Sequence, residues 1–221
     1  MGMEFRVDPR VLIPRPETEI LVQAALEALW TEREGGAPRG SLVADIGCGS
    51  GAIGLSIARL RPDARVMLTD ISAGALEVAM ANASDLGVAD KVRFFCGDLA
   101  EPLLAAGFAG QFDLVVSNPP YIPSEEMDDL PPEVRLFEPG VALDGGPGGL
   151  RVIQRLACEA APLLKGGGRL FLEIGDDQAH ACRETFERAG VWQDFRILLD
   201  YSGKQRVFSA GARKEREEGE A

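Results

Sequence analysis

The stretch Phe112-Asp113-Leu114-Val115-Val116-Ser117-Asn118-Pro119-Pro120-Tyr121 decides how this chain folds. It begins as a short apolar run, which is typical of a buried strand in a parallel sheet. The two prolines end that strand, because proline lacks a backbone N–H and has a fixed φ. Asn118 therefore follows the carboxyl end of the strand, which is the edge where open α/β sheets bind ligands.

Strands alternate with helices on both sides of this stretch. We expect strands at residues 41–46, 65–70, 91–96, 112–117, 169–174, 192–199 and 205–209, with helices between most of them. The alternation predicts a doubly wound α/β fold. The last two strands have a connection too short for a parallel crossover, so they should pair antiparallel. The prediction is a Rossmann-like, seven-stranded, mostly parallel sheet with one antiparallel edge strand.

The remaining segments complete the predicted domain organisation. Residues 1–15 alternate apolar and charged residues around Asp8-Pro9-Arg10 and indicate an N-terminal β-hairpin. Residues 16–210 form the main domain, in which Lys165-Gly166-Gly167-Gly168 ends a helix, and the charged residues 211–221 should be disordered. Residues 122–149 hold five prolines and are acidic, which favours an ordered active-site flap.

Composition excludes several classes of partner. The 221 residues carry a net charge of −12, with 35 acidic against 23 basic side chains, which disfavours stable binding to nucleic acid. Four cysteines without CxxC spacing and a single histidine, His180, predict no metal site. There is no apolar segment of membrane-spanning length and no secretory signal, so we expect a cytoplasmic protein with reduced thiols. We also expect a monomer.

A glycine-rich loop follows the first strand of the main domain. Asp45-Ile46-Gly47-Cys48-Gly49-Ser50-Gly51 lets the backbone turn tightly and approach a ligand, and Asp70 at the end of the next strand can accept hydrogen bonds from ribose hydroxyls. Asp45 would repel a pyrophosphate but attract a cation, and S-adenosylmethionine carries an ammonium and a sulfonium. The pattern therefore favours that cofactor. Asp98 is expected to accept from the adenine amino group, and Leu99 to cover the adenine face. The expected cofactor residues are Asp45, Gly47, Cys48, Gly49, Ser50, Gly51, Asp70, Ile71, Asp98, Leu99 and Asn118.

The proline-terminated stretch supplies the chemistry. Methyl transfer needs a nucleophile held close to the methyl group and in line with it. An amide nitrogen is a poor nucleophile, and two acceptors gripping its N–H groups would fix it and accommodate positive charge. The Asn118 side-chain oxygen and the Pro119 carbonyl can be those acceptors, while Tyr121 offers a flat apolar face. A plain turn is the simpler alternative. The expected catalytic residues are Asn118, Pro119, Pro120 and Tyr121.

The sequence resembles a known family. Ser117-Asn118-Pro119-Pro120-Tyr121 is similar to the signature of methyltransferases that act on planar nitrogens, both N6-adenine and glutamine-N5 enzymes. The run from Val11 to Glu19, Val-Leu-Ile-Pro-Arg-Pro-Glu-Thr-Glu, resembles the HemK/PrmC family of peptide chain release factor glutamine methyltransferases. Further similar stretches are Glu138-Pro139, Ala142-Leu143-Asp144-Gly145-Gly146, Leu172-Glu173-Ile174-Gly175 and Asp200-Tyr201-Ser202-Gly203-Lys204-Gln205-Arg206.

The resemblance implies methylation of the Gly-Gly-Gln glutamine in class 1 peptide chain release factors, a step that serves translation termination. Arg15, Glu17, Asn118, Pro119 and Tyr121 would bind that substrate. The bacterial family usually has a helical domain ahead of Phe5-Arg6-Val7, so this chain is expected to be the catalytic domain without it. Three alternatives are an N6-adenine nucleic-acid methyltransferase, a ribosomal-protein glutamine methyltransferase and a catalytically silent cofactor-binding domain.

Overall fold

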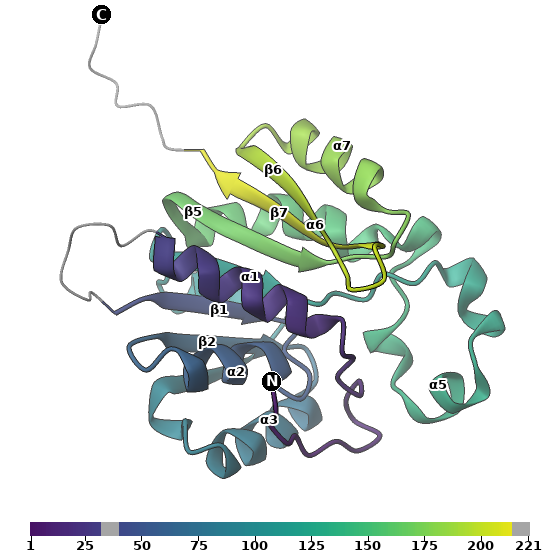
Figure 1. The fold of residues 1–221 in the computed structure, drawn as a ribbon, viewed down its shortest axis with the longest axis horizontal. Coiled ribbons are helices and arrows are strands. Elements are labelled where there is room, and N and C mark those ends of the chain that lie inside the picture. The colour runs from purple at the N-terminus through teal and green to yellow at the C-terminus, as the bar shows by residue number, and fades with distance from the viewer. Residues whose placement is uncertain (32–39, 214–221) are drawn as a thin grey trace, which may run out of the picture.

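A seven-stranded mixed sheet forms the centre of the molecule, in the order β3-β2-β1-β4-β5-β7-β6 (Figure 1). The computed structural model describes residues 1–31 and 40–213. Parallel pairing joins β3 to β2, β2 to β1, β1 to β4 and β4 to β5, whereas β7 runs antiparallel to both of its neighbours. The strands are β1 (Leu42–Ile46), β2 (Arg65–Asp70), β3 (Val92–Cys96), β4 (Phe112–Ser117), β5 (Leu164–Glu173), β6 (Trp192–Leu199) and β7 (Gln205–Ala212).

The position of the antiparallel strand differs from the sequence-based prediction. The expected antiparallel pairing of the last two strands is confirmed, but β7 lies between β5 and β6, and the edge strand is β6. A short connection only requires that β6 and β7 pair antiparallel. It does not determine which of the two inserts beside β5. The choice follows burial, because β7 is almost wholly buried while β6 is mostly exposed.

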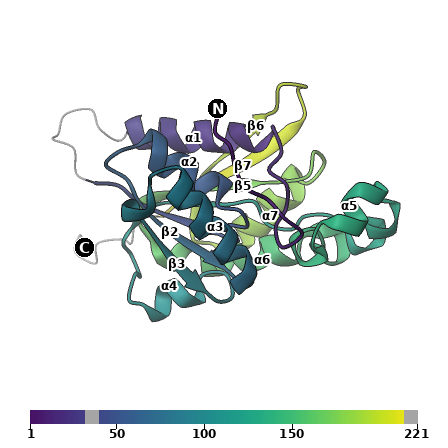
Figure 2. The same cartoon turned by 90° about the horizontal axis from the view of Figure 1, so that it is seen from below.

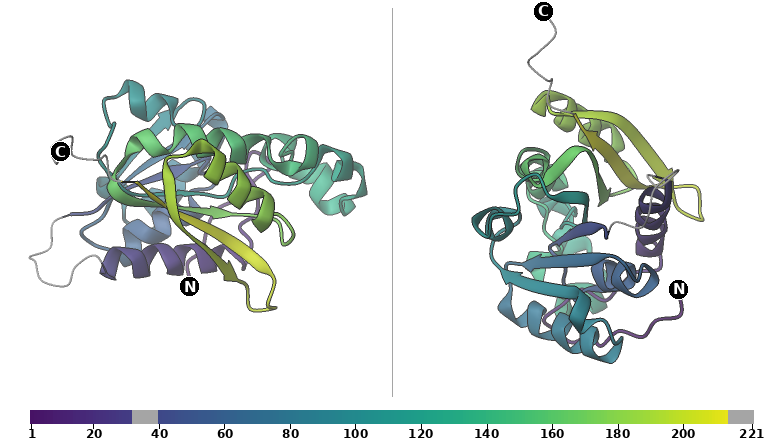
Figure 3. Two further views of the ribbon diagram at one scale, coloured as in Figure 1. Left: turned by 90° about the horizontal axis from the view of Figure 1, so that it is seen from above. Right: turned by 90° about the vertical axis from the view of Figure 1, so that its left-hand side faces the viewer.

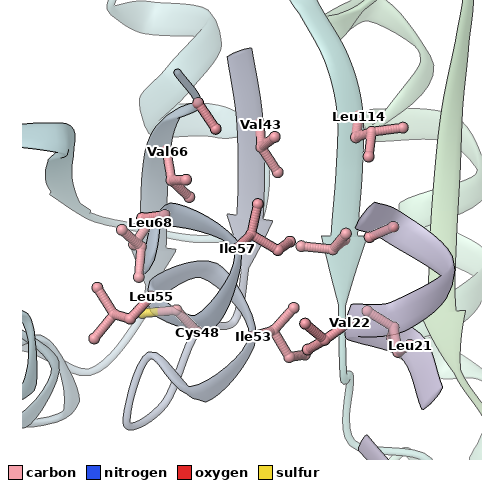
Figure 4. Packing of buried hydrophobic residues seen from close by; sticks show 14 of the residues in the cluster. Leu21, Val22, Val43, Cys48, Ile53, Leu55, Ile57, Val66, Leu68 and Leu114 are labelled. Carbon is pink, nitrogen blue, oxygen red and sulfur yellow. The ribbon is translucent and has the colours of Figure 1, made fainter. Parts of the chain in front are cut away.

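Helices cover both faces of the sheet, each over its own apolar core. The first core lies under α1, α2 and α3, and the second under α4, α6 and α7 (Figure 2). Figure 4 shows side chains of α1 and α2 meeting those of the strands in the first core. The helices are α1 (Thr18–Thr31), α2 (Ala52–Leu60), α3 (Ala73–Asp85), α4 (Glu101–Ala105), α5 (Pro132–Phe137), α6 (Arg151–Glu159) and α7 (Ala179–Ala189).

Strand β4 serves both cores, because its side chains alternate between the two faces from Leu114 onward and the register is irregular between Phe112 and Leu114. Leu114 and Val116 belong to the first core, and Phe112 and Val115 to the second. All four are fully buried, which explains the continuous apolar run in the sequence. None of the described helices, over residues 1–31 and 40–213, is long and apolar enough to cross a membrane.

Residues 1–15 contain no strand, so the predicted N-terminal β-hairpin is wrong. They run as an extended strap along α3, where the Asn82 side chain takes the place of a partner strand. Asn82 Oδ1 accepts from the Arg6 backbone N–H at 2.7 Å, and its Nδ2 donates to the Arg6 carbonyl at 3.0 Å and to the Ser50 carbonyl at 2.9 Å. Val11, 2% exposed, packs against α3. One buried asparagine thus ties the strap to both α3 and the glycine loop.

Two further predictions near the sheet need correction. Residues 165–168 do not simply end a helix, because they belong to β5. At Gly168 an added Cβ would lie 3.0 Å from the Phe112 carbonyl oxygen, so a glycine allows this close approach to β4. Gly211 and Ala212, expected in a disordered tail, complete β7. The rest of that tail, from residue 214, lies outside the described residues.

Residues 122–149 form an arm that extends from the sheet and carries α5 (Figure 3). Its two ends meet near β4, where Ile122 N donates to the Leu143 carbonyl at 3.0 Å and Gly145 N to the Ile122 carbonyl at 2.8 Å. Besides α5 it contains the 3-10 helices Ser124–Asp129, Gly140–Ala142 and Pro147–Gly149. The arm is therefore folded, and its function as a flap stays a prediction.

Candidate active site

A cavity of about 740 Å³ opens where β1, β2 and β4 end. This volume is in the range of sites for small-molecule ligands. The cavity has four walls: the glycine loop, the ends of β2 and β3, the residues after β4 with the arm, and the strap. Among its lining residues are Leu12, Gly47, Gly49, Asp70, Leu99, Asn118, Pro120, Asp144 and Arg155.

The glycine loop is shaped by its own backbone hydrogen bonds. The N–H groups of Gly47 and Cys48 both donate to the Thr69 carbonyl at 2.9 Å. Gly51 begins the entry into α2 with φ of +81°, and an added Cβ would lie 2.7 Å from Leu55 Cδ1. A side chain there would be strained by both the backbone and the contact. This part of the sequence pattern has a structural cause that does not depend on a ligand.

Asp70 closes the loop from the opposite side. Its Oδ2 accepts from Gly49 N at 2.9 Å and its Oδ1 from Ser72 N at 2.9 Å. Each carboxylate oxygen can accept more than one hydrogen bond, so Asp70 retains capacity for hydroxyl groups of a ligand. Cys48, Ser50 and Ile71, from the predicted cofactor set, line the same cavity.

Asp45 departs from its predicted place. It is fully buried behind the loop, does not line the cavity, and accepts from Gly54 N at 2.8 Å through Oδ2. Burial raises the pKa of Asp45 to about 7, the Gly54 N–H opposes this shift, and the negative charge of Asp70 adds to it. The direct attraction of a ligand cation by Asp45 is therefore wrong as a description of the site. Asp45 instead holds the start of α2 against β1.

The raised pKa of Asp45 makes stability depend on pH. In the unfolded chain this carboxyl titrates near the ordinary aspartate pKa of 3.8 and in the folded protein near about 7, so the folded protein binds more protons between these values. Its contribution to stability falls as pH rises across this window, by up to about 4 kcal/mol. We expect Asp45→Asn to flatten this dependence and to gain stability relative to the parent protein at pH 8. Urea unfolding at pH 5 and pH 8 measures it, and an equal change in stability with pH for both proteins would contradict the assignment.

The end of β3 holds a strained residue and an ion pair. Leu99 lines the cavity with φ of +45°, which is rare for a leucine, and its carbonyl accepts from Thr69 Oγ1 at 3.1 Å. The Asp98 carboxylate pairs with Arg155 of α6, with 2.9 Å from Oδ2 to Nη2. Arg155 also lines the cavity and pairs with Glu159. Sequence reasoning missed Arg155, because nothing in its own helix indicates that it reaches Asp98.

The residues after β4 divide between the cavity and its rear wall. Asn118 and Pro120 line the cavity, whereas Pro119 is buried and Tyr121 packs against the second core. Ser117 fixes the end of the strand by donating from Oγ to the Ile46 carbonyl at 2.6 Å. The Tyr121 hydroxyl donates to Glu173 Oε1 at 3.2 Å. The predicted catalytic stretch is thus held rigidly, but Tyr121 does not line the cavity.

The strap and the start of α1 meet the arm beside the cavity. Arg15 Nη2 donates to Glu138 Oε1 at 2.5 Å, and Glu138 is nearly buried. Arg15 lines a smaller cavity of about 260 Å³ that shares Pro14, Thr18 and Ala52 with the large one. Glu17 lines neither cavity. Sequence reasoning also missed the strap residues Arg10, Val11, Leu12 and Pro14 in the cavity wall, because a hairpin was expected there.

The site fits a ligand such as S-adenosylmethionine. Gly47 and Gly49 leave open space where a Cβ would stand, Asp70 offers acceptors, and Ile71 and Leu99 add apolar surface. Similar folds occur among solved structures. A methyltransferase from Pyrococcus furiosus aligns with a TM-score of 0.66 at 18% identity over 97% of this chain and 90% of its own. The hMettl16 catalytic domain, solved with MAT2A 3'UTR hairpin 6, aligns with 0.71 at 13% identity over 98% and 77%. The chain therefore has the fold of the class I methyltransferases.

Sequence comparison gives the family. Residues 20–131 match the family of the methyltransferase small domain. The release factor glutamine methyltransferase of Moorella thermoacetica is 45% identical over 97% of this chain and 72% of its own length. The enzyme of the same description from Chlorobaculum tepidum is 41% identical over 96% and 70%. The chain belongs to the family of release factor glutamine methyltransferases, which confirms the resemblance noted in its sequence.

Proposed function

We propose that this chain transfers a methyl group from S-adenosylmethionine to the side-chain amide nitrogen of the Gly-Gly-Gln glutamine in class 1 peptide chain release factors. Membership in the family of release factor glutamine methyltransferases supports this choice of substrate. The single observation that carries the chemistry is that Asn118, at the end of β4, lines the same cavity as the glycine loop and Asp70. The Asn118 side-chain amide and a nucleotide-type loop therefore line one cavity of adequate size.

The chain's own residues would hold the cofactor at the sheet edge. Bound there, S-adenosylmethionine supplies an electrophilic methyl group on a sulfonium. Asp70 would accept from ribose hydroxyls, since both of its oxygens are already oriented by backbone N–H groups. Leu99 and Ile71 would cover the adenine. Asp98 is oriented by Arg155, which leaves acceptor capacity on its oxygens for the adenine amino group.

Asn118 and Pro119 would hold the target amide. The Asn118 Oδ1 and the Pro119 carbonyl would each accept one N–H of the glutamine side chain, which fixes its nitrogen and stabilises the positive charge that develops on it. In the overall reaction an N–C bond forms, the methyl–sulfur bond breaks and one amide proton is released. No acid or base of this chain is required to act on the methyl group itself.

The strap and the arm would form the substrate entrance. Arg15 joins them through Glu138, so the two walls of the entrance are tied together. Leu136 and Phe137 of α5 and Val141 are more than half exposed on this arm and offer apolar contacts to a protein partner. The enzyme is expected to act as a monomer.

Charge around the entrance decides against the second candidate, an N6-adenine nucleic-acid methyltransferase. The arm, residues 122–149, holds seven acidic side chains and one basic one. Glu125, Glu126, Asp128 and Asp129 are exposed on it. A phosphate backbone would be repelled there, because phosphate contacts need local cations. A ribosomal-protein glutamine methyltransferase would hold its target amide in the same way. An experiment therefore has to distinguish that alternative from the proposed function.

Competition between substrates tests the function. Methyl-labelled S-adenosylmethionine is incubated with the protein and equal amounts of a class 1 release factor, a ribosomal-protein fraction and duplex DNA. We expect the label to enter the release factor at least about tenfold faster than either competitor, which corresponds to about 1.4 kcal/mol in transition-state binding. Preferential labelling of DNA or of a ribosomal protein would overturn the assignment.

A further inference from the structure

Two stretches of the sequence carry the family resemblance without an assigned task. They are Leu172-Glu173-Ile174-Gly175, at the end of β5, and the stretch before and at the start of β7 that ends in Arg206. The register of β4 with β5 pairs Ser117 with Leu172, so Glu173 lies beside Asn118 at the same sheet edge. Glu173 is 1% exposed, and an acidic side chain so deeply buried needs partners.

The Glu173 carboxylate has hydrogen-bond partners in α1 and in the stretch that follows β4. Its Oε2 accepts from Thr18 Oγ1 of α1 at 2.6 Å, and its Oε1 accepts from the Tyr121 hydroxyl at 3.2 Å. The side chain of Asn118 lies beside it across the register of β4 with β5, and it lowers the pKa of the carboxyl as a hydrogen-bond donor does. Arg206 of β7 donates from Nη1 to the Ile174 carbonyl at 3.1 Å, and its positive charge favours the ionised form of Glu173. Burial raises the pKa of Glu173, while Thr18, Arg206, Tyr121 and Asn118 oppose that shift by favouring the charged form.

The hydrogen-bonding chemistry of the Glu173 carboxylate and the Asn118 side-chain amide determines how that amide is oriented. Thr18, Arg206 and Tyr121 all favour the ionised form of Glu173. An ionised carboxylate only accepts hydrogen bonds, and the only donor on an asparagine side chain is its Nδ2 amide. The Nδ2 of Asn118 must therefore point to Glu173, and Oδ1 points the other way. If the amide turned over, two oxygens would face each other in a buried place, which is unfavourable.

We propose that Glu173, held by Thr18 and Tyr121, is a positioning residue that selects the orientation of the Asn118 amide in which Oδ1 faces the target nitrogen. The proposal rests on the proposed function for its kinetic consequence, but the contact itself is independent of the substrate. It also gives Tyr121 a task that suits its place behind the cavity: it holds the carboxylate rather than the substrate. Binding of the target glutamine by Asn118 would then depend on the Glu173 carboxylate, although Glu173 does not contact the glutamine.

The contact can be measured without any substrate, because the chain has only two asparagines, Asn82 and Asn118. Protein labelled with ¹⁵N in asparagine alone gives two side-chain amide pairs, and Asn118→Ala identifies the pair of Asn118. In the parent protein we expect the Asn118 amide protons to exchange with water at least about tenfold more slowly than those of a free asparagine. Glu173→Gln should weaken this protection, because the glutamine amide can present either its oxygen or its NH2 group to Asn118. Asn82, bonded to Arg6 and Ser50, serves as an internal reference. Unprotected Asn118 protons in the parent protein would overturn the proposal, whether or not any release factor is methylated.

Kinetics separate positioning from simple structural support. We expect Glu173→Gln to lower kcat by about 10²-fold, as for a displaced catalytic group, with a change in KM for release factor of less than about threefold. Thr18→Val removes a hydrogen bond from the far oxygen of the same carboxylate and should cost less than about tenfold. The combination of Glu173→Gln with Asn118→Asp restores a donor–acceptor pair and should exceed each single variant in kcat. Losses that simply multiply in the double variant would contradict positioning. If the parent protein methylates no release factor, the proposed function fails while the exchange experiment still decides the contact.

Discussion

Replacing Asn118 with alanine is expected to lower methyl transfer to release factor by about 10³-fold or more. The change removes one of two acceptors that would grip the target amide, and loss of a single group that stabilises transition-state charge costs about 10²–10³-fold in other enzymes. Loss of positioning adds to this. Cofactor affinity should change by less than about fivefold, because the glycine loop, Asp70 and Leu99 remain. Rates with saturating release factor and calorimetric cofactor binding measure the two effects.

The matched control for this experiment is Asn118→Asp. It keeps the size of the side chain but places a second carboxylate against the buried Glu173. We expect it to lose activity as well, which shows that an acceptor alone is not sufficient. Thermal unfolding of both variants checks that the fold is kept. An Asn118→Ala protein that methylates release factor within tenfold of the parent rate would remove Asn118 from the mechanism.

The second large effect is expected at Gly149, where the arm rejoins the sheet. An added Cβ would lie 2.1 Å from the Tyr121 carbonyl oxygen and 2.4 Å from Gln178 Nε2. Gln178 Nε2 itself donates to that carbonyl at 2.8 Å, so a methyl group would separate the two. With φ of +73°, Gly149→Ala also strains the backbone. We expect a loss of about 3–5 kcal/mol in unfolding free energy and at least about 10²-fold in methyl transfer.

Gly148→Ala controls for the backbone strain. Gly148 has φ of +62°, similar to that of Gly149, but nothing lies within 4 Å of its added Cβ. We expect this variant to lose about 1 kcal/mol, from left-handed strain alone, and to keep activity within about threefold. Urea unfolding and initial rates compare the pair. Equal losses in the two variants would show that the close approach to Tyr121 is unimportant.

Sequence reasoning succeeded where the pattern has one physical cause. Buried runs such as Leu114 to Val116 can only be strands in this context, because both of their faces meet apolar cores. The glycine loop was located correctly because its turn requires residues such as Gly51 at positive φ. The end of β4 follows from the two prolines alone.

The errors occurred where partners distant in sequence decide the structure. The alternating pattern of residues 3–7 suggested a hairpin, but the Asn82 side chain of α3 satisfies the backbone of Arg6 instead. The acidic residue before the glycine loop was expected to meet the ligand, whereas Asp45 is buried against Gly54. The order of β6 and β7 depends on which strand is better buried beside β5.

The same reason explains which site residues were missed. Thr18 reads as a helix-entry residue, and its hydrogen bond to Glu173 spans 155 positions of the chain. The sequence suggests only that Arg155 forms an ion pair with Glu159 on α6, yet Arg155 also forms an ion pair with Asp98. No local pattern encodes contacts of this kind. Only the resemblance pointed to the stretch around Glu173, and it did so without a physical account.

The most direct test of the central claim is to locate the methyl group on the product. A class 1 release factor is incubated with S-adenosylmethionine and either the parent protein or Asn118→Ala, and its Gly-Gly-Gln peptide is then sequenced by tandem mass spectrometry. The account predicts a mass gain of one methyl group on the glutamine side chain with the parent protein and none with the variant. A methyl group on any other residue, or an unmodified glutamine after cofactor and active-site integrity have been verified, would contradict it.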